Sequence, residues 1–416
     1  MRIGVLSEIK PGERRVALPP EAVSALCAAD DTTVTVQSGA GRHLFASDDD
    51  YRAAGAEIAD SAEQLAAGVD VLAVVNPPEP SVIAALPPGA SLLGLLNPFQ
   101  EAQAMLALRD QGVTAYALEL IPRISRAQSV DALSSQALVS GYRAALVGAE
   151  LLPRFFPLFM TAAGTIPPAR VLVLGAGVAG LQAIATARRL GAVVSGYDVR
   201  AAAADEVRSL GATFVDLKLE TQEGAGGYAK SQSADFATRQ HAALAPFVAE
   251  SDVVITTAAI PGRAAPLLVT EEMVMAMRPG SVVVDLAAQS GGNCALSKPG
   301  ETGVFNGVSV WGGADVPSQL PVHASKLYGA NISAFVALIK AGDMQDEILA
   351  GSRVTEGGRF VHEAVRNALA PNEPEPAPAS TPEPTPEPQP ALSSEQPDQP
   401  DPIEVPGPSD QSAQPE

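Results

Sequence analysis

Short apolar runs alternate with helical stretches through the first part of the chain, and Gly, Pro or Asn bounds many of the runs. Runs of this length predict buried strands, and their alternation with helices predicts a doubly wound α/β domain. Strands are expected over residues 2–6, 32–37, 70–75, 90–96 and 113–120, and helices over residues 20–28, 48–55 and 61–68. We therefore assign residues 1–134 to an N-terminal α/β domain.

The alternation resumes after an alanine-rich run over residues 133–152, which is typical of a helix and would bridge two domains. Further strands are expected over residues 171–174, 192–197, 213–217, 252–257, 281–286 and 307–311. Residues 135–324 are thus expected to form a second α/β domain. A helical run over residues 327–341, within a returning segment 325–370, is expected to pack back on the first domain and complete it.

Two stretches interrupt this pattern. Residues 155–169 are apolar but contain three prolines and Gly164, so we expect a protruding hairpin or loop, of a kind that a partner subunit covers. Residues 220–233 are polar and glycine-rich around Tyr228, which is typical of a mobile loop.

A glycine-rich turn follows the strand at residues 171–174. Gly175, Gly177 and Gly180 have the G-x-G-x-x-G spacing, and Val178 and Ala179 begin the helical run that follows. In a dinucleotide-binding turn these glycines permit the tight turn, the approach of a pyrophosphate and close helix packing. Asp198 ends the next strand about 20 residues on, where a carboxylate binds the ribose hydroxyls and disfavours a 2′-phosphate. The context predicts an NAD(H) site; the alternative is a glycine turn in an ordinary α/β domain.

The chain changes character after Ala370. Pro makes up about a third of residues 371–416, Lys and Arg are absent, and no apolar periodicity remains. This composition predicts a disordered acidic tail. The tail holds half of the acidic excess behind the net charge of −20, and that charge argues against nucleic acid as a partner.

The cysteine content and the hydropathy of the chain limit its expected cellular compartment and its relation to the membrane. Cys27 and Cys294 lie far apart in the sequence and the four histidines are scattered, so we expect a reducing cytosol and no metal site; one disulfide is the less favoured alternative. The strand-like start argues against a signal peptide. Residues 171–187 are uncharged but contain the glycine turn, so they are interpreted as a strand and a helix, not a membrane span.

The opening residues 1–10 and the run Glu13 to Pro19 resemble the N-terminus shared by alanine dehydrogenases and the NAD(H)-binding alpha subunit of proton-translocating NAD(P) transhydrogenase. The resemblance extends to about residue 345. It implies two Rossmann-like domains with the nucleotide in an interdomain cleft, and the question becomes which of the two activities this chain has.

Alanine dehydrogenases resemble this chain but carry a catalytic Lys, His and Asp. The matching positions here are Asn76, Asn97 and Gln289, and Arg15, which would suit a carboxylate, is kept. Oxidising an amine needs a base, which three neutral side chains do not supply. Hydride transfer between two nicotinamides needs only orientation, so these neutral residues favour transhydrogenation.

The segment from Pro122 to Gln136 closely matches the loop that transhydrogenases place over the dihydronicotinamide. The match implies that Gln128 brings the two rings together near the nicotinamide ribose. It implies that Arg123, Asp131 and Ser134 fix the ring carboxamide and the loop. A plain structural alternative is that Asp131 or Ser134 caps the helix that follows, which is compatible with a functional role.

The resemblance assigns three further contacts to the nucleotide site. Tyr228 matches the tyrosine of a loop that closes over bound nucleotide, and Ala258 and Gln289 follow strands and are expected to line the cleft. The four histidines fall in no matching motif.

The resemblance implies a Re/Si-specific, proton-translocating NAD(P)+ transhydrogenase in which this chain binds NAD(H). NADP(H) would bind on a partner beta subunit, and membrane-spanning subunits would carry the proton. The chain would be a homodimer in the cytoplasm, held at the inner membrane through its partners. Two alternatives stay open: a soluble enzyme like alanine dehydrogenase, and a non-catalytic NAD(H) sensor.

Overall fold

The computed structural model describes residues 1–28, 31–219, 234–259 and 264–371. These described residues belong to one compact unit. The expected mobile loop at residues 220–233 and the expected disordered tail at residues 372–416 lie outside the described residues. The domain boundaries after residues 134 and 324 fall inside the compact unit and stay predictions.

The first sheet is mainly parallel, in the order β17-β16-β6-β5-β4-β1-β2-β3. Its strands are β1 (Arg2–Val5), β2 (Thr33–Gln37), β3 (Glu57–Ala59), β4 (Val71–Ala73), β5 (Ser91–Gly94), β6 (Thr114–Ala117), β16 (Arg353–Glu356) and β17 (Arg359–Phe360). The helices around it are α1 (Pro20–Cys27), α2 (Asp48–Ala53), α3 (Ala62–Ala67), α4 (Pro80–Ala85), α5 (Ala102–Asp110), α11 (Pro321–Ala341), α12 (Glu347–Ser352) and α13 (Glu363–Leu369). Strands β1 to β6 pair in parallel, and β16 and β17 add an antiparallel edge.

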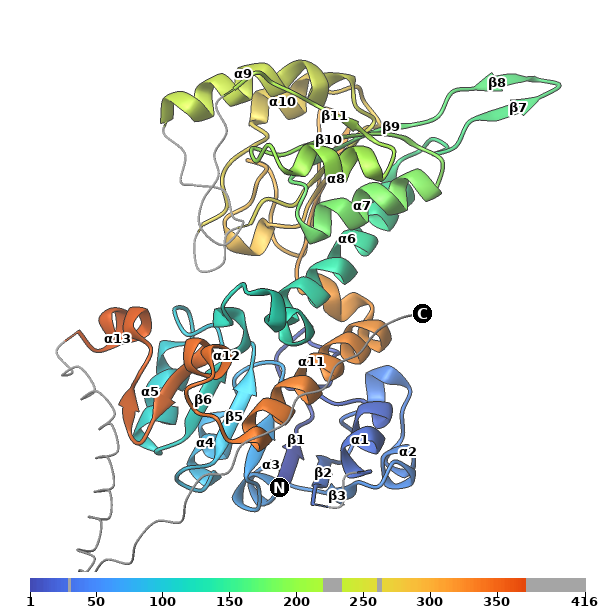
Figure 1. The fold of residues 1–416 in the computed structure, drawn as a ribbon. Coiled ribbons are helices and arrows are strands. Elements are labelled where there is room, and N and C mark those ends of the chain that lie inside the picture. The colour runs from blue at the N-terminus through green and yellow to red at the C-terminus, as the bar shows by residue number, and fades with distance from the viewer. Residues whose placement is uncertain (29–30, 220–233, 260–263, 372–416) are drawn as a thin grey trace, which may run out of the picture. The chain divides into compact units, whose positions relative to one another are not determined.

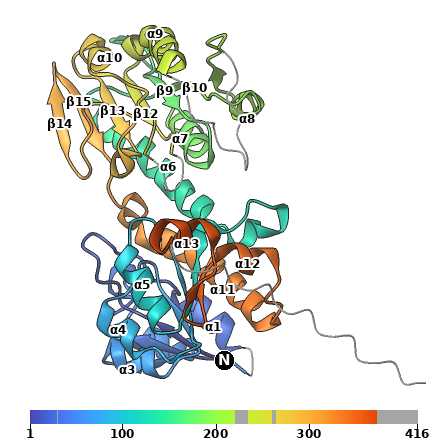
Figure 2. The ribbon, with the colours of Figure 1, turned by 90° about the vertical axis from the view of Figure 1, so that its left-hand side faces the viewer.

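The second sheet has the order β11-β10-β9-β12-β13-β15-β14, with only β14 antiparallel among the described strands. Its strands are β9 (Arg170–Leu174), β10 (Val193–Tyr197), β11 (Thr213–Phe214), β12 (Val253–Thr256), β13 (Val282–Asp285), β14 (Thr302–Phe305) and β15 (Val308–Gly312). The helices with it are α6 (Ala132–Leu151), α7 (Val178–Arg189), α8 (Ala203–Ser209), α9 (Ala234–Glu250) and α10 (Glu271–Ala276), and Figures 1 and 2 show helices on both faces.

Both sheets have the strand order of a dinucleotide-binding Rossmann fold. In each, the strand that comes first in the sequence lies third from one edge, and the order reverses beside it: between β1 and β4 in the first sheet, and between β9 and β12 in the second. Ligands of such sheets bind outside the carboxyl ends of the strands at this reversal. The predicted fold class, two doubly wound α/β halves, is confirmed.

Most of the helices and strands predicted from the sequence are present, but the bounds of some differ from the predicted ones. The strand expected over residues 113–120 ends at Ala117 and continues as the 3₁₀ turn η2 (Leu118–Leu120). The helix expected from residue 327 begins at Pro321, because proline fits the first turn of a helix. The returning segment 325–370 is more than a helix, since it also supplies β16 and β17 to the first sheet.

The segment over residues 155–169 is a hairpin, as one of the two sequence interpretations predicts. Strands β7 (Phe159–Thr161) and β8 (Gly164–Ile166) pair antiparallel, and Figure 1 shows them projecting away from the second sheet. The exposed large apolar side chains here are Phe155, Leu158, Phe159, Met160 and Ile166. Apolar side chains gathered on one projection are typical of a surface that another protein covers.

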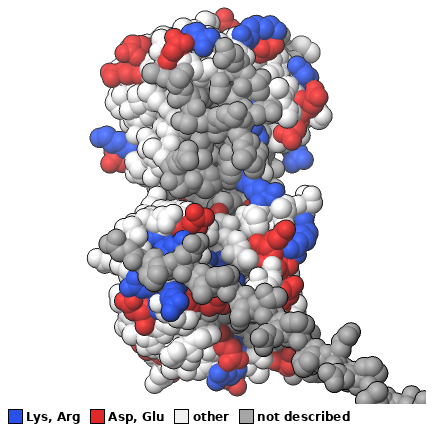
Figure 3. Space-filling model, turned by 60° about the vertical axis from the view of Figure 1, so that its left-hand side comes forward, with Lys and Arg blue, Asp and Glu red and all other residues white. Residues whose placement is uncertain are grey.

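The surface of the described residues mixes charges of both signs. Figure 3 shows acidic and basic side chains interspersed over the visible face, without a large area of either sign. None of the helices in the described part of the chain is long and apolar enough to cross a membrane.

Candidate functional site

The glycine turn joins β9 to α7 at the reversal point of the second sheet. Gly175 has φ +100°, and its backbone N–H donates to the carbonyl of Tyr197 at 2.8 Å. A Cβ atom built on Gly180 would lie 1.8 Å from the carbonyl oxygen of Gly175. Both glycines are therefore required by the turn itself, one for its backbone conformation and one for its close packing.

Gly177 is different, because a Cβ atom there would meet no atom of the described chain within 4 Å. Its neighbour Val178 is 41% exposed, although it opens a helix whose later residues are buried. The chain's own packing therefore does not explain glycine at this position. The approach of a pyrophosphate to the free N–H groups of the α7 N-terminus does explain it, so the turn fits a dinucleotide.

Asp198 lies directly after β10 and accepts a hydrogen bond from the glycine turn. Its carboxylate accepts the N–H of Ala176 at 2.8 Å and the backbone N–H of Arg200 at 2.9 Å. The guanidinium of Arg200 also donates to it, with Nε–Oδ1 at 2.9 Å and Nη2–Oδ2 at 3.1 Å. The acid is placed beside the glycine turn, and its charge is shared with an arginine.

Ala258 lies beside Gly175, with its backbone nitrogen 3.2 Å from the Cβ position of that glycine. The side-chain amide of Asn293 holds this backbone: its Oδ1 accepts the N–H of Ala258 at 3.0 Å, and its Nδ2 donates to the Ala258 carbonyl at 2.8 Å. The backbone N–H of Asn293 donates in turn to the fully buried carboxylate of Asp285 at 2.9 Å. Asp285 thereby anchors the loop behind the turn.

Gln289 has its polar partner elsewhere in the chain. Its Oε1 accepts the N–H of Asp315 at 2.9 Å, and the Asp315 carboxylate lies 4.0 Å from the Lys10 ammonium. Gln289 thus bonds to the segment before α11, and its contact with a nucleotide stays a prediction.

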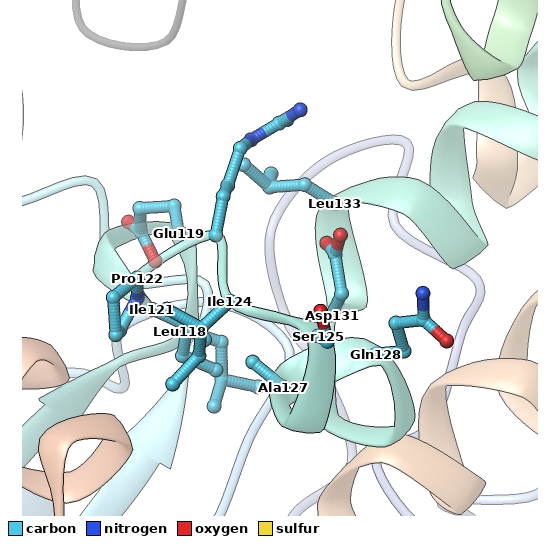
Figure 4. Close-up of a pocket in the computed structure, with 11 residues that line it drawn as sticks. Leu118, Glu119, Ile121, Pro122, Ile124, Ser125, Ala127, Gln128, Asp131 and Leu133 are labelled. Atoms are coloured by element: carbon cyan, nitrogen blue, oxygen red, sulfur yellow. The ribbon is translucent and has the colours of Figure 1, made fainter. Parts of the chain in front are cut away.

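The loop from Leu118 to Leu133 surrounds a pocket of about 460 Å³. Arg123, Gln128 and Asp131 line it, with Glu119 on the same rim. Figure 4 shows Gln128 and Asp131 on the segment that leads into α6, with Glu119 across the pocket from them. Three of the four predicted hydride-transfer residues therefore surround one pocket.

Ser134, the fourth, is bonded to Asp131. The Asp131 carboxylate accepts the Ser134 N–H at 2.9 Å and its hydroxyl at 2.6 Å, which caps the N-terminus of α6. Behind the loop, the Asn331 amide on α11 donates to the Ser129 carbonyl at 2.8 Å. The predicted cap is confirmed, and it fixes the loop at the start of a long helix.

Arg15 lies in a buried polar cluster near the amino-terminal end of α6. Its Nε and Nη2 donate to the Glu13 carboxylate at 2.8 and 2.7 Å, and its Nη1 donates to Gln136 Oε1 at 3.0 Å. The Asn76 amide bridges the carboxylates of Glu13, at 2.9 Å, and Glu8, at 3.2 Å. Three of the arginine's nitrogens are thus occupied by the chain itself.

Burial and pairing shift the pKa values of Glu13 and Glu8, the two acids of this cluster, in opposite directions. Burial raises the pKa of Glu13, but the hydrogen bonds and charge of Arg15 outweigh it and lower that pKa to about 2. Burial raises the pKa of Glu8 to about 7, and the hydrogen bonds that it accepts from the Asn76 amide and from backbone N–H groups offset this rise only in part. At neutral pH the cluster therefore holds one arginine, one full carboxylate and one acid near its midpoint.

Asn97 follows β5 with φ +46°, an uncommon backbone conformation outside glycine. The Glu119 carboxylate accepts the N–H groups of Leu96, at 3.2 Å, and of Asn97. Burial raises the pKa of Glu119 to about 7. This acid links the end of β5 to the rim of the loop pocket.

Apart from Gln289, which bonds to Asp315, the predicted residues in the described part of the chain form two groups, the loop pocket and the glycine turn, and α6 leads from the first group to the second. Tyr228 lies outside the described residues. The sequence alone did not single out Glu13, Glu119, Asp285 or Asn293 as site residues, although Asp285 and Asn293 lie four residues either side of Gln289, which was expected to line the cleft. Within the described residues, no three His, Cys, Asp or Glu side chains gather in a way that could hold a metal ion.

Two family models match this chain, the alanine dehydrogenase/PNT N-terminal domain over residues 4–140 and its C-terminal domain over residues 144–363. The first portion of the NAD(P) transhydrogenase subunit alpha of Rhodospirillum rubrum is 46% identical over 380 residues, covering 88% of this chain and 99% of the relative. The crystal structure of a transhydrogenase from Sinorhizobium meliloti superposes with a TM-score of 0.78 at 40% identity, covering 88% of this chain and 100% of that one. The alanine dehydrogenase of Bacillus subtilis is 31% identical over 385 residues, covering 89% of this chain and 95% of the relative.

Proposed function

We propose that this chain, which belongs to the alanine dehydrogenase/PNT family, is the NAD(H)-binding alpha subunit of an NAD(P) transhydrogenase. It would bind NADH in a cleft between its two α/β halves, and the hydride would pass directly to NADP+ on a partner subunit. The higher identity to transhydrogenase alpha subunits than to alanine dehydrogenases supports this choice within the family.

The buried cluster around Arg15 is the observation that carries the proposal. An enzyme that oxidises an amino acid needs a cation free for the substrate carboxylate and a base for its proton. Here Arg15 is bound to Glu13 and Gln136, and neutral Asn76 lies between Glu13 and Glu8. Because Arg15 already binds Glu13 and Gln136, the cluster favours a site in which this arginine holds no substrate carboxylate.

The loop pocket supports hydride transfer by orientation. Bound NADH supplies the hydride, so NADH is oxidised, NADP+ is reduced, and this step moves no proton to or from the chain. Arg123 and Gln128 offer the exposed donors and acceptors that would hold the ring, and Asp131 and Ser134 fix the loop that carries them. Correct placement of two reactants removes much of such a barrier without acid–base chemistry.

NAD(H) is the proposed nucleotide because of the acid beside the glycine turn. Asp198 would accept from the adenosine ribose hydroxyls and disfavour a 2′-phosphate. Its pairing with Arg200 at 2.9 Å reduces the net charge there, so the preference would rest on the hydroxyl contacts more than on repulsion.

The finer assignments follow from the same proposal. The exposed apolar hairpin β7–β8 supports a homodimer in which the partner covers it. Membrane-spanning subunits, including the NADP(H)-binding beta subunit, would translocate the proton, and the chain would associate peripherally with the inner membrane from the cytoplasmic side. The Re/Si stereospecificity of the transfer is part of this proposal.

A mixing experiment separates this function from its two alternatives. The chain is combined with an NADP(H)-binding subunit, and reduction of an NADP+ analogue by NADH is followed at saturating nucleotide. Rapid transfer, together with no turnover of NAD+ and L-alanine, is expected. Turnover with alanine would favour a dehydrogenase, and NADH binding with no transfer would favour a sensor.

A further inference from the structure

One helix connects the loop pocket to the glycine turn. The helix α6 begins at the Asp131 cap of the loop, and Gly141 lies two turns further along, about 10 Å from Ser134 at 1.5 Å per residue. Figure 1 shows α6 passing directly against α7, the helix that opens at the glycine turn.

The contact between the two helices is backbone to backbone at Gly141. A Cβ atom on this buried residue would lie 2.0 Å from the carbonyl oxygen of Ala179 and 2.9 Å from its Cα. Ala179 belongs to the first turn of α7, between Gly177 and Gly180. Because these nearest atoms are backbone and not the end of a flexible side chain, any side chain at residue 141 must push the helices apart.

We propose that Gly141 is a positioning residue, which holds the hydride-transfer loop in register with the nucleotide-binding turn. The inference rests on the proposed function and deepens it. Nucleotide affinity would come from the turn at Gly177, and the rate of transfer would come from where the loop places the ring. Gly141 sets the distance between the two, since α6 carries the loop at its start and contacts α7 at this residue.

The substitution Gly141→Ala tests this role. The methyl group needs about 1 Å more room to reach even the shortest Cβ contacts that proteins tolerate. A misplacement of about 1 Å by a residue remote from the chemistry can cost on the order of 100-fold in rate. We expect hydride transfer at saturating NADH to slow by about that factor, while the Kd for NADH changes much less because the turn moves with α7.

Gly148→Ala is the matched control on the same helix. Its methyl group would meet the Cγ1 atom of Val253 on β12 at 2.9 Å, a side-chain contact away from α7. This variant should lose stability but transfer hydride at close to the wild-type rate. The three proteins are compared in complex with the NADP(H)-binding subunit, with NADH affinity and thermal unfolding measured on each.

Two results overturn the proposal: a Gly141→Ala protein with the wild-type rate at saturation, or an equal slowing in Gly148→Ala. Absence of transfer in the wild type would count against the proposed function instead. If the Gly141→Ala protein does not fold, a second measurement on the wild-type chain tests the same role. In hydrogen exchange of the wild-type chain, NADH should protect both the first turn of α7 and residues 132–141. Protection confined to α7 would contradict the proposal that the contact at Gly141 links the loop to the turn.

Discussion

The ion pair between Glu13 and Arg15 offers a quantitative test of the buried cluster. The side chains are 1% and 8% exposed and make two hydrogen bonds of 2.8 and 2.7 Å. Arg15→Ala leaves the Glu13 carboxylate buried without its cation, and Ser318 and Asn76 remain as neutral donors.

The expected loss of stability is large for a single substitution. Removing one partner of a buried pair typically costs about 3–5 kcal/mol. The pKa of Glu13 gives a similar figure, because its fall from 4.5 to about 2 corresponds to roughly 3 kcal/mol at about 1.4 kcal/mol per unit. This contribution is fully present above pH 4.5 and is lost as the pH falls through 2.

Urea denaturation at pH 7 measures the free energy of unfolding of Arg15→Ala against the wild type. Arg52→Ala is the control, because the Arg52 side chain is 55% exposed and that of its partner Asp49 is 89% exposed. Such a surface pair should contribute about 0–1 kcal/mol to stability. The double variant Glu13→Gln with Arg15→Met should lose less than Arg15→Ala, since it leaves no unpaired charge. Equal, small losses in Arg15→Ala and Arg52→Ala would show that the buried pair contributes no more than a surface pair.

Three further predictions concern the loop, the turn and a buried acid. Gln128→Asn should slow hydride transfer and leave NADH affinity nearly intact; weaker binding with an unchanged rate would contradict an orienting role. Gly180→Ala places a methyl group against the Gly175 carbonyl, so it should lower the free energy of unfolding by about 1–3 kcal/mol and weaken NADH binding. Gly68→Ala is the control, because its methyl group meets nothing closer than 3.6 Å, and it should change neither stability nor NADH binding. Burial raises the pKa of Glu119 from 4.5 to about 7, so the folded chain holds a proton that the unfolded chain releases, and the free energy of unfolding should fall as the pH rises between these values. Glu119→Gln should flatten that fall in urea titrations, and an unchanged slope would show that the acid titrates normally.

The sequence predicts features whose causes lie close together along the chain. The strand before Gly175, the turn and α7 follow one another directly, and the Asp131 cap spans three residues. Each of these elements is decided by local backbone preferences and apolar periodicity, which a single sequence displays.

Features made by distant residues were not predictable in this way. Arg15 meets Gln136 across 121 positions, and Ala115 meets Thr355 across 240 where β16 joins the first sheet. Nothing near residue 353 signals that its strand will pair antiparallel with β6. The contact between Arg15 and Gln136 matters most, because the sequence keeps an arginine suited to a carboxylate and only the fold shows Gln136 already bound to it.

A single-turnover mixing experiment decides whether this chain is the NADH side of a transhydrogenase. The NADH-loaded chain is mixed with an NADP(H)-binding subunit that carries an oxidised NADP+ analogue. Deuterium at the transferring position of NADH should appear in the reduced analogue with none lost to water, because the hydride passes directly between the rings. Transfer that requires added L-alanine or pyruvate, or deuterium released to solvent, would contradict this assignment.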